Sequence, residues 1–155
     1  MIALSLAAKF PEAEVHAVDV SDDALALAQE NAENLGLTGR VQFAKSNLLE
    51  NFSERFDLIV ANLPYVSKQD RGSLSREVLR DPEIALFGGE QGDQLIRQLI
   101  ERVPDHLQPA GLLAMEIGIG QGDTLSELLI RKNYRDIDLR KDYAGTPRFL
   151  LARYG

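Results

Sequence analysis

The stretch FDLIVANLPYV (residues 56–66) ends in the four residues best suited to chemistry, Asn62-Leu63-Pro64-Tyr65. Pro64 disfavours helical geometry at Leu63, so the chain is expected to stay extended past the apolar part of the stretch. The Asn62 side-chain oxygen and the Leu63 carbonyl then form two hydrogen-bond acceptors on a stiff turn, and Tyr65 adds an aromatic face for a planar group. Two acceptors directed at one point suit a substrate NH2 group, which has two protons to donate.

Such an arrangement is useful because an amide or aryl amine nitrogen is a poor nucleophile, its lone pair being delocalised. Acceptors that hold both protons while the nitrogen becomes pyramidal favour the transition state over the planar ground state. The proton can leave after the nitrogen has formed its new bond, so no strong base is required. A strand-ending Asn-x-Pro turn with a packed tyrosine explains the same tetrapeptide without any function, and both interpretations stay open on these residues alone.

Two further polar residues follow predicted strands. Asp19 closes the stretch HAVDV (residues 16–20), where a carboxylate can accept from both hydroxyls of a ribose; a helix cap or surface acid is the alternative. Asn47 follows residues 41–45, and its alternative role is a turn residue bonded to its own backbone.

Other candidates are more simply explained by structure. The glycines of EIGIGQGDT (Gly118, Gly120 and Gly122) resemble a phosphate-binding loop, but no ribose-binding acid follows them at the usual interval, so a tight strand-to-helix turn is favoured. His16 and His106 are predicted to be structural, and Met115 to lie in the core.

The elements that position these residues alternate between strand and helix. The apolar patterns predict strands at 14–20, 41–45, 57–61 and 112–117, with Pro109-Ala-Gly111 as the turn before the last of these. They predict four helices: one at residues 2–9, one that follows the cap Ser21, one that begins at Asp93 and one that begins at Asp123 or Thr124. The helix after Ser21 has an apolar face of Leu25, Ala28, Ala32 and Leu35. Residues 67–93 are polar and irregular, and 136–141 and 148–154 form a terminal hairpin. This order predicts an α/β sandwich with a mostly parallel sheet, and it places Asp19, Asn47 and Asn62 at one edge of it.

Composition narrows the possible functions. The 155 residues suit one domain, and 24 acidic against 17 basic residues give a net charge of −7 without a basic run, so a polyanionic partner has no support. The absence of cysteine excludes disulfides, cysteine-ligated zinc and a cysteine nucleophile, and two histidines argue against a histidine-rich metal site. No apolar run reaches the roughly 20 residues of a membrane span, and the opening MIALSLAA lacks the basic start of a signal peptide. A cytoplasmic protein without a metal or a membrane partner is expected.

Together these residues resemble class I S-adenosylmethionine-dependent methyltransferases, and more narrowly the glutamine N5-methyltransferases of peptide-chain release factors (the HemK/PrmC family). The resemblance covers the whole chain. It is carried by IALSLAAKFPEAEVHAVDVSDDALALAQENAENLGL, FDLIVANLPYV, REVLRDPEIALFGGEQGDQLI and DYAGTPRFLLARYG. The fold it implies is a Rossmann-like sandwich that ends in an antiparallel hairpin.

The resemblance implies a role for each site residue. Asp19 holds the ribose of S-adenosylmethionine, Asn47 and Leu48 line its adenine, and Asn62 lies between the cofactor and the substrate. Residues 62–65 (Asn62, Leu63, Pro64 and Tyr65) bind the glutamine amide of the release factor, and no metal is implied. The sequence departs from the family pattern at Asn47, where the family has an acid, and at Leu63, where it has a first proline.

The family pattern also places a helical domain, a first strand and a glycine-rich loop before the residues that match here. Residues 1–155 are therefore expected to be a single, N-terminally incomplete catalytic domain, to bind S-adenosylmethionine weakly or not at all on their own, and to self-associate through exposed strand edges.

Two other functions stay open. The spelling NLPY also resembles rRNA adenine N6-dimethyltransferases, and a degenerate, non-catalytic binding domain remains possible. The segment DPEIALFGGEQG, the terminal hairpin and the acidic charge favour the release-factor family and make direct nucleic-acid binding the weaker expectation.

Overall fold

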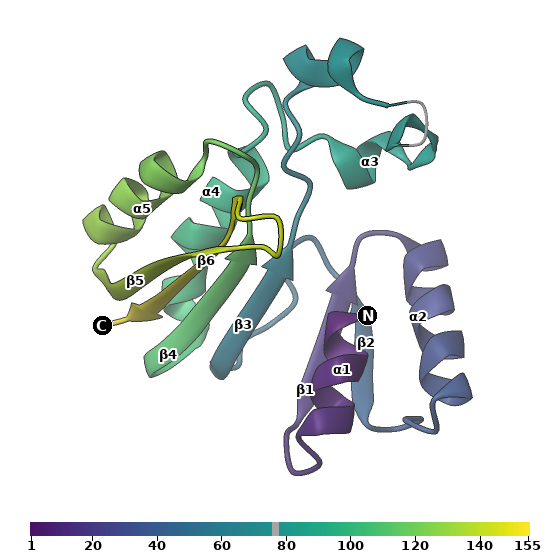
Figure 1. Ribbon diagram of the computed structural model, residues 1–155. Coiled ribbons are helices and arrows are strands. Elements are labelled where there is room, and N and C mark those ends of the chain that lie inside the picture. The colour runs from purple at the N-terminus through teal and green to yellow at the C-terminus, as the bar shows by residue number, and fades with distance from the viewer. Residues whose placement is uncertain (76–77) are drawn as a thin grey trace. The chain divides into compact units, whose positions relative to one another are not determined.

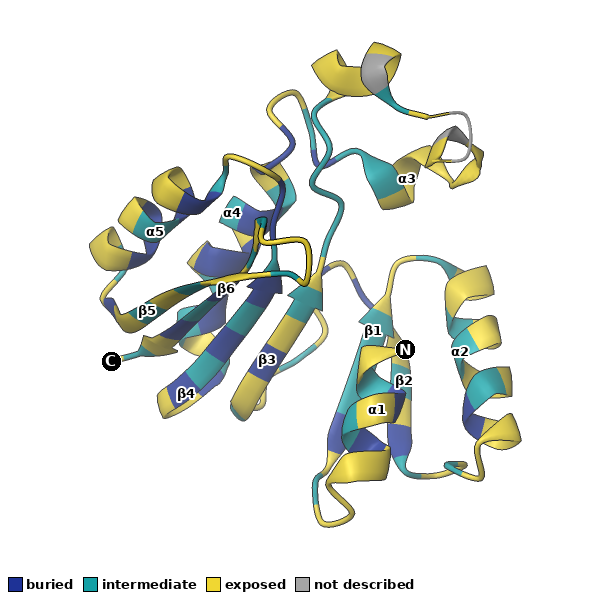
Figure 2. Ribbon diagram, in the orientation of Figure 1, coloured by how far each residue is buried: buried dark blue, intermediate teal, exposed yellow. Residues whose placement is uncertain are grey.

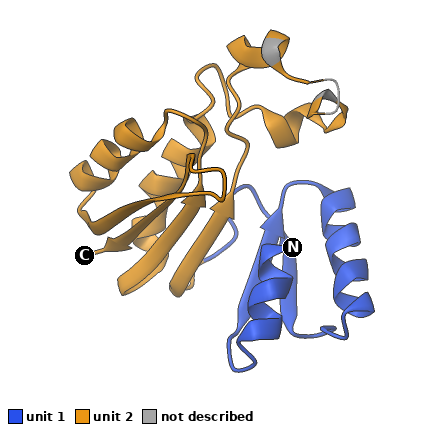
Figure 3. Ribbon diagram, viewed as in Figure 1, with its two compact units in different colours: residues 1–52 blue, residues 53–155 orange. Residues whose placement is uncertain are grey.

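The computed structural model describes residues 1–75 and 78–155 and divides into two compact units, Met1–Phe52 and Ser53–Gly155 (Figure 3). Each unit has its own sheet and its own buried apolar core. The predicted alternation of helices and strands is confirmed.

Unit 1 is a strand–helix–strand motif preceded by a helix (Figure 1). Its elements are α1 (Ile2–Lys9), β1 (Val15–Asp19), α2 (Asp22–Asn34) and β2 (Val41–Lys45). The two strands pair in parallel, from Val15 opposite Val41 to Asp19 opposite Lys45. Parallel neighbours need a crossover connection, and α2 supplies it.

The core of unit 1 joins both helices to the strands. Leu4 and Ala7 of α1, Ala32 of α2, and the first residues of both strands, Val15 and Val41, are buried in one cluster. The carboxyl ends of β1 and β2, by contrast, carry the exposed residues Asp19 and Lys45. The apolar cluster therefore lies toward one end of the two strands, and polar, exposed side chains stand at the other end.

The predicted start of α2 is confirmed, and its predicted apolar face is only partly so. The Ser21 hydroxyl accepts a hydrogen bond from the backbone N–H of Ala24 at 3.2 Å, as expected for a helix cap. Ala32 is buried, but the Leu35 side chain is 59% exposed. Leu35 is the residue that ends the helix, so its side chain leaves the face that the periodicity assigned to it.

Unit 2 contains a four-stranded mixed sheet in the order β3-β4-β6-β5. Its strands are β3 (Phe56–Asn62), β4 (Leu107–Glu116), β5 (Tyr134–Lys141) and β6 (Pro147–Tyr154). β3 and β4 are parallel, whereas β6 pairs antiparallel with both β4 and β5. The predicted terminal hairpin is therefore confirmed, and it completes the sheet.

The helices of unit 2 bury its largest apolar side chains. They are α4 (Gln94–Arg102) and α5 (Gly122–Arg131), with the short segments η1 (Lys68–Ser73), η2 (Val78–Arg80), α3 (Glu83–Leu86) and η3 (Val103–Asp105). Buried residues gather on β4, β6, α4 and α5 (Figure 2), and include Ile96, Ile100, Leu107, Leu113, Ile117, Leu125, Leu129 and Leu150. Met115 is buried as predicted.

The prediction of a turn at Pro109-Ala-Gly111 is wrong, because these residues lie inside β4. Phe56 pairs with Leu107 but Leu58 pairs with Leu112, so extra residues of β4 bulge out between the two pairs. Ala110 at the bulge has a φ of 61°. Pro, Ala and Gly are common in turns, but at this place they form a bulge. A bulge needs the same positive φ as many turns and does not end the strand.

The described residues contain no helix with the length and apolar character to cross a membrane. The same residues contain no group of three or more His, Cys, Asp or Glu side chains placed to hold a metal ion.

Candidate functional site

Asn62 is the last residue of β3 and lies opposite Glu116, the last residue of β4. The two strands are parallel, so both side chains stand at the carboxyl end of the pair, where open α/β sheets bind ligands. Asn62 is exposed, and among residues 1–75 and 78–155 no group hydrogen-bonds its side chain. Both ends of its amide are therefore available to a ligand.

Tyr65 is held by contacts at its hydroxyl and its ring. The hydroxyl donates to Glu116 Oε1 at 3.0 Å, and the guanidinium carbon of Arg148 lies 5.5 Å from the ring centroid. Burial, and then the hydrogen bond and negative charge of Glu116, raise the pKa of Tyr65, while Arg148 opposes the rise. The phenol therefore stays protonated at neutral pH and serves as a donor to Glu116.

The backbone of Tyr65 is bound by the turn that joins β4 to α5. Gln121 Nε2 donates to the Tyr65 carbonyl at 3.1 Å, and Gln121 Oε1 accepts from the Gly118 N–H at 2.8 Å. The Gln121 N–H closes the turn on the Gly118 carbonyl, and Gly120 has a φ of 81°. The predicted tight turn is confirmed, and it directs Gln121 to Tyr65.

Two glycines of the segment FGGEQG allow a second close approach. A Cβ atom on Gly88 would overlap the Pro64 carbonyl oxygen, and one on Gly92 would overlap that of Tyr65. Val66 pairs with Phe87 in parallel, and its carbonyl accepts from the Gly88 N–H at 3.0 Å. The segment that the resemblance matched separately from the NLPY motif thus packs directly against it.

In unit 1, Asp19 closes β1 and is exposed. Its Oδ1 accepts from the Ser21 N–H at 2.9 Å, and its carbonyl accepts from the Ser46 N–H at 3.1 Å, which ties the ends of β1 and β2 together. The other carboxylate oxygen has no partner among the described residues. Asp19 thus stabilises the entry to α2 with one oxygen and can still accept from a ligand with the other.

Asn47 is exposed just beyond β2, in a turn that its own backbone helps to form. Its side-chain Nδ2 donates to Glu50 Oε1 at 2.9 Å, and its carbonyl accepts from the Glu50 N–H at 3.3 Å. Leu48 follows with a φ of 53° and a buried side chain. The turn role weighed from the sequence is present, and no described residue donates to the Asn47 amide oxygen.

The structure thus places Asp19, Asn47 and Leu48 together at the end of the unit 1 sheet, and residues 62–65 at the end of the unit 2 sheet. Sequence reasoning missed Glu116, Gln121 and Arg148. The sequence did carry a signal for Glu116, since this acidic residue ends an apolar strand pattern in the same way as Asp19. No local pattern pointed to Gln121 or Arg148.

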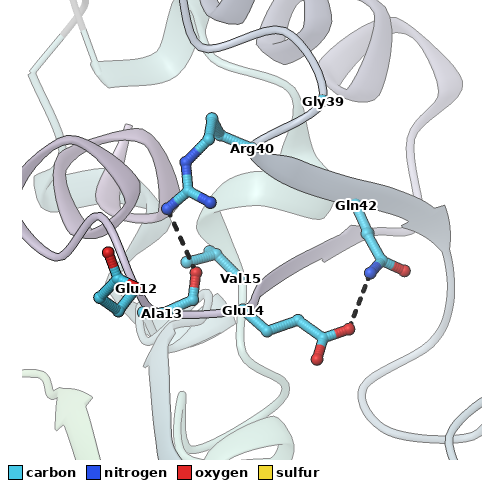
Figure 4. A pocket seen from close by; sticks show the side chains of 7 residues that line it. All are labelled: Glu12, Ala13, Glu14, Val15, Gly39, Arg40 and Gln42. Atoms are coloured by element: carbon cyan, nitrogen blue, oxygen red, sulfur yellow. Dashed lines mark hydrogen bonds between the residues drawn. The ribbon is translucent and has the colours of Figure 1, made fainter.

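A separate pocket of unit 1 lies at the opposite, amino-terminal ends of β1 and β2 (Figure 4). It is lined by Glu12, Ala13, Glu14, Val15, Gly39, Arg40 and Gln42. Arg40 donates to the Ala13 carbonyl at 3.3 Å, and Gln42 Nε2 donates to Glu14 Oε1 at 2.9 Å. Arg40 and Gln42 thus bind groups of the pocket itself, and none of the predicted site residues lines it.

Residues 1–89 match the methyltransferase small domain family. The chain is 41% identical over 157 residues to the release factor glutamine methyltransferase of Synechocystis sp., covering 98% of this chain and 52% of that protein. It is 41% identical over 117 residues to the ribosomal protein uL3 glutamine methyltransferase of Neisseria gonorrhoeae, covering 76% of this chain and 39% of that protein. The chain thus spans about half the length of the release factor methyltransferases that it matches.

The fold is that of known methyltransferases. A crystal structure of a methyltransferase from Pyrococcus furiosus superposes with a TM-score of 0.75 at 22% identity, covering 100% of this chain and 69% of that chain. At this identity the likeness shows the fold, which confirms the expected class I methyltransferase architecture.

Proposed function

Because this chain belongs to the methyltransferase small domain family, we propose that it transfers a methyl group from S-adenosylmethionine to the side-chain amide nitrogen of a glutamine in a peptide-chain release factor. The observation that carries the proposal is an exposed Asn62, whose side chain has no hydrogen-bond partner among the described residues, beside a tyrosine whose ring and hydroxyl are both contacted. The identity with release factor glutamine methyltransferases supports the choice of substrate.

The residues of unit 1 fit the adenosine part of the cofactor. Asp19 keeps one carboxylate oxygen without a partner among the described residues, and Asn47 keeps its amide oxygen. We assign the ribose hydroxyls to Asp19, and the adenine to Asn47 and Leu48. When bound, S-adenosylmethionine supplies a methyl group on a positively charged sulfur, which makes that carbon open to attack.

The residues of unit 2 fit the glutamine amide. Residues 62–65 form the substrate corner. Asn62 Oδ1 and the Leu63 carbonyl accept the two amide protons, Pro64 stiffens the corner, and Tyr65 stacks on the amide plane. Holding both protons turns the nitrogen lone pair toward the methyl carbon, so Asn62 also belongs beside the cofactor. In the transfer the glutamine nitrogen would accept the methyl group that the cofactor supplies, and it would release one of the two protons held by Asn62 and the Leu63 carbonyl to water.

A labelling experiment tests the proposal. The chain is incubated with millimolar S-adenosylmethionine that carries a labelled methyl group, and with a release factor, ribosomal protein uL3 or bulk RNA. Label on a glutamine of the release factor is the expected result, and a release factor with that glutamine replaced by alanine is the control. Label on RNA alone rejects the proposal in favour of a nucleic-acid amino-methyltransferase.

The other outcomes separate the remaining functions. Label on uL3 rather than the release factor keeps glutamine methylation but changes the substrate, as the identity with the Neisseria gonorrhoeae enzyme allows. No label on any substrate, from a folded chain, favours a non-catalytic binding domain.

Because release factors act on ribosomes, the proposal also places the chain in the cytoplasm.

A further inference from the structure

Glu116 reaches the tyrosine of the substrate corner from a strand that the NLPY motif does not include. We propose that Glu116 is a positioning residue, which acts through the Tyr65 hydroxyl to hold the tyrosine ring against the substrate amide. The inference rests on the proposed function and adds to it a residue outside the motif.

Glu116 is well placed to hold another side chain because its own backbone is fixed on both sides. It pairs with Asn62 of β3 in one direction and with Phe149 of β6 in the other. A residue at the end of an inner strand moves less than one in a loop, so the position of its carboxylate is defined by the sheet. The hydroxyl that it binds belongs to Tyr65, which lies beyond the end of β3 in an irregular segment.

The bond between the two residues joins a phenol to a carboxylate over 3.0 Å. This distance is within the ordinary range for a hydroxyl donor, and a carboxylate oxygen is a better acceptor than a neutral one. Glu116 is half-buried, so water competes with it less than at the surface. The ring of Tyr65 is therefore held in one orientation by a contact at the tip of the side chain.

Arg148 supplies the second constraint, on the ring itself. Its Nη1 donates to the Ile117 carbonyl at 3.4 Å, and its Nε lies 3.8 Å from Asp142 Oδ2. With its hydroxyl bound to Glu116 and its ring contacted by Arg148, Tyr65 is confined without being a group that reacts. Stacking on a planar amide needs this confinement, because the ring must stay parallel to a group that is about to change shape.

A double-mutant cycle tests this role. Glu116→Ala is expected to lower kcat for release factor methylation by about tenfold to a hundredfold, the scale of a displaced positioning group. Tyr65→Phe removes the hydroxyl and keeps the ring, so it is expected to cause a similar loss. If Glu116 acts through the hydroxyl, adding Glu116→Ala to Tyr65→Phe causes no further loss. Losses that multiply in the double variant overturn the proposal.

Two further variants separate positioning from general destabilisation. Glu116→Gln keeps an oxygen that accepts from Tyr65, so it is expected to recover most of the activity lost in Glu116→Ala. Glu127→Ala is the matched control, because Glu127 lies exposed on α5 and pairs with Arg131. Its kcat is expected to equal that of the unaltered chain. Loss in Glu116→Gln equal to that in Glu116→Ala contradicts the proposal.

A measurement without substrate keeps the inference separate from the proposed function. Alkaline absorbance titration of the chain, minus that of Tyr65→Phe, follows the ionisation of Tyr65 alone. Because Glu116 raises the pKa of Tyr65, Glu116→Ala is expected to lower it. If the unaltered chain methylates no glutamine but this shift is seen, the proposed function fails and the contact stands. An unchanged titration curve means that Glu116 does not hold the hydroxyl, and the inference fails whatever the activity.

Discussion

Asn62 and Glu116 are register partners at the carboxyl ends of two parallel strands, β3 and β4. Both side chains therefore come from paired strands, one as the proposed contact to the substrate and the other as a support for Tyr65. A catalytic corner that grows out of a sheet keeps its geometry better than one built on loops alone. Single substitutions in the corner and in its supports are therefore expected to change the activity in ways that can be predicted.

The first prediction concerns Asn62 itself. Asn62→Ala is expected to lower the rate of glutamine methylation by about a hundredfold to a thousandfold, the cost of removing one group that stabilises a transition state. The fold is expected to be intact, because the side chain is exposed and no described residue hydrogen-bonds it. Initial rates with a release factor measure the first effect, and thermal unfolding followed by circular dichroism measures the second.

Asn34→Ala is the matched control, since Asn34 is exposed at the end of α2. It is expected to change neither measurement. Full turnover in Asn62→Ala would show that the corner does not bind the reacting amide, and the proposed function would then lose its central residue.

The second prediction concerns the glycine that packs against the corner. Gly88→Ala places a Cβ atom on the carbonyl oxygens of both Gly92 and Pro64, so the backbone at one or both of these residues must move. Overpacking of this kind is expected to destabilise the fold by about 1–3 kcal/mol and to lower the methylation rate through displacement of Pro64. Urea denaturation gives the free energy of unfolding, and rates are compared at a temperature where both proteins are folded.

Gly72→Ala is the control for that substitution. No atom lies within 4 Å of a Cβ built on Gly72, so this variant is expected to keep both stability and rate. A Gly88→Ala variant as active and as stable as Gly72→Ala would mean that the segment around Gly88 does not support the corner.

The third prediction concerns the proposed ribose contact. Asp19→Asn keeps an oxygen that can accept from the Ser21 N–H, but it replaces the other carboxylate oxygen with a donor. It is therefore expected to weaken S-adenosylmethionine binding by about tenfold, the value of one hydrogen bond, while the fold is retained. Titration calorimetry at millimolar cofactor measures the affinity. Asp23→Asn, in the first turn of α2, is the control, and equal affinity in both variants removes Asp19 from the site.

Local patterns were sufficient to predict the strands and helices that carry the motif residues. Alternation and capping predicted β1, β2 and β3 and the Ser21 cap, because each depends on residues close together in the chain. The motif NLPY was visible for the same reason. The apolar strand runs into this polar tetrapeptide because Asn62 is exposed at the end of β3 and Tyr65 is half-buried beyond it.

The supports of the corner could not be predicted in that way. Tyr65 and Glu116 are 51 residues apart, and Tyr65 and Gln121 are 56 apart. Only the pairing of β3 with β4 brings them together. The bulge at Ala110 was missed for a related reason, because turn residues look alike whether they end a strand or distort it.

The fourth prediction concerns β3, the end strand of the unit 2 sheet. β3 pairs with β4 on one side and lies at the end of its sheet as the structure describes it, with Leu58 and Val60 more than a third exposed. An apolar edge of this kind favours pairing between copies, so the chain is expected to self-associate, and Val60→Lys to suppress it. Sedimentation velocity over a concentration series measures this. Ile130→Lys, on an exposed helical position of α5, removes similar apolar surface without altering the edge and is expected to have no effect.

The last prediction concerns stability at alkaline pH. Tyr134 is buried, its hydroxyl donates to the Ile100 carbonyl at 3.3 Å, and its ring meets that of Tyr154 edge-on with centroids 5.3 Å apart. Burial, followed by the negative charge that Tyr154 would carry, raises the pKa of Tyr134 above its ordinary value of about 10. The unfolded chain therefore loses this proton at a lower pH than the folded chain does.

The sign of the effect follows from that difference. The stabilisation by Tyr134 is fully present below about pH 10 and is lost as the pH rises toward the pKa of the folded state, so the free energy of unfolding is expected to fall above about pH 10. Tyr134→Phe is expected to cost about 0.5–1.5 kcal/mol at neutral pH, for the lost hydrogen bond, and to make the alkaline fall shallower. Urea denaturation from about pH 8 to about pH 11 measures both effects. Tyr143→Phe, at a fully exposed position, is expected to reproduce the unaltered pH curve, and an equally steep fall in Tyr134→Phe would show that burial of this hydroxyl is not its cause.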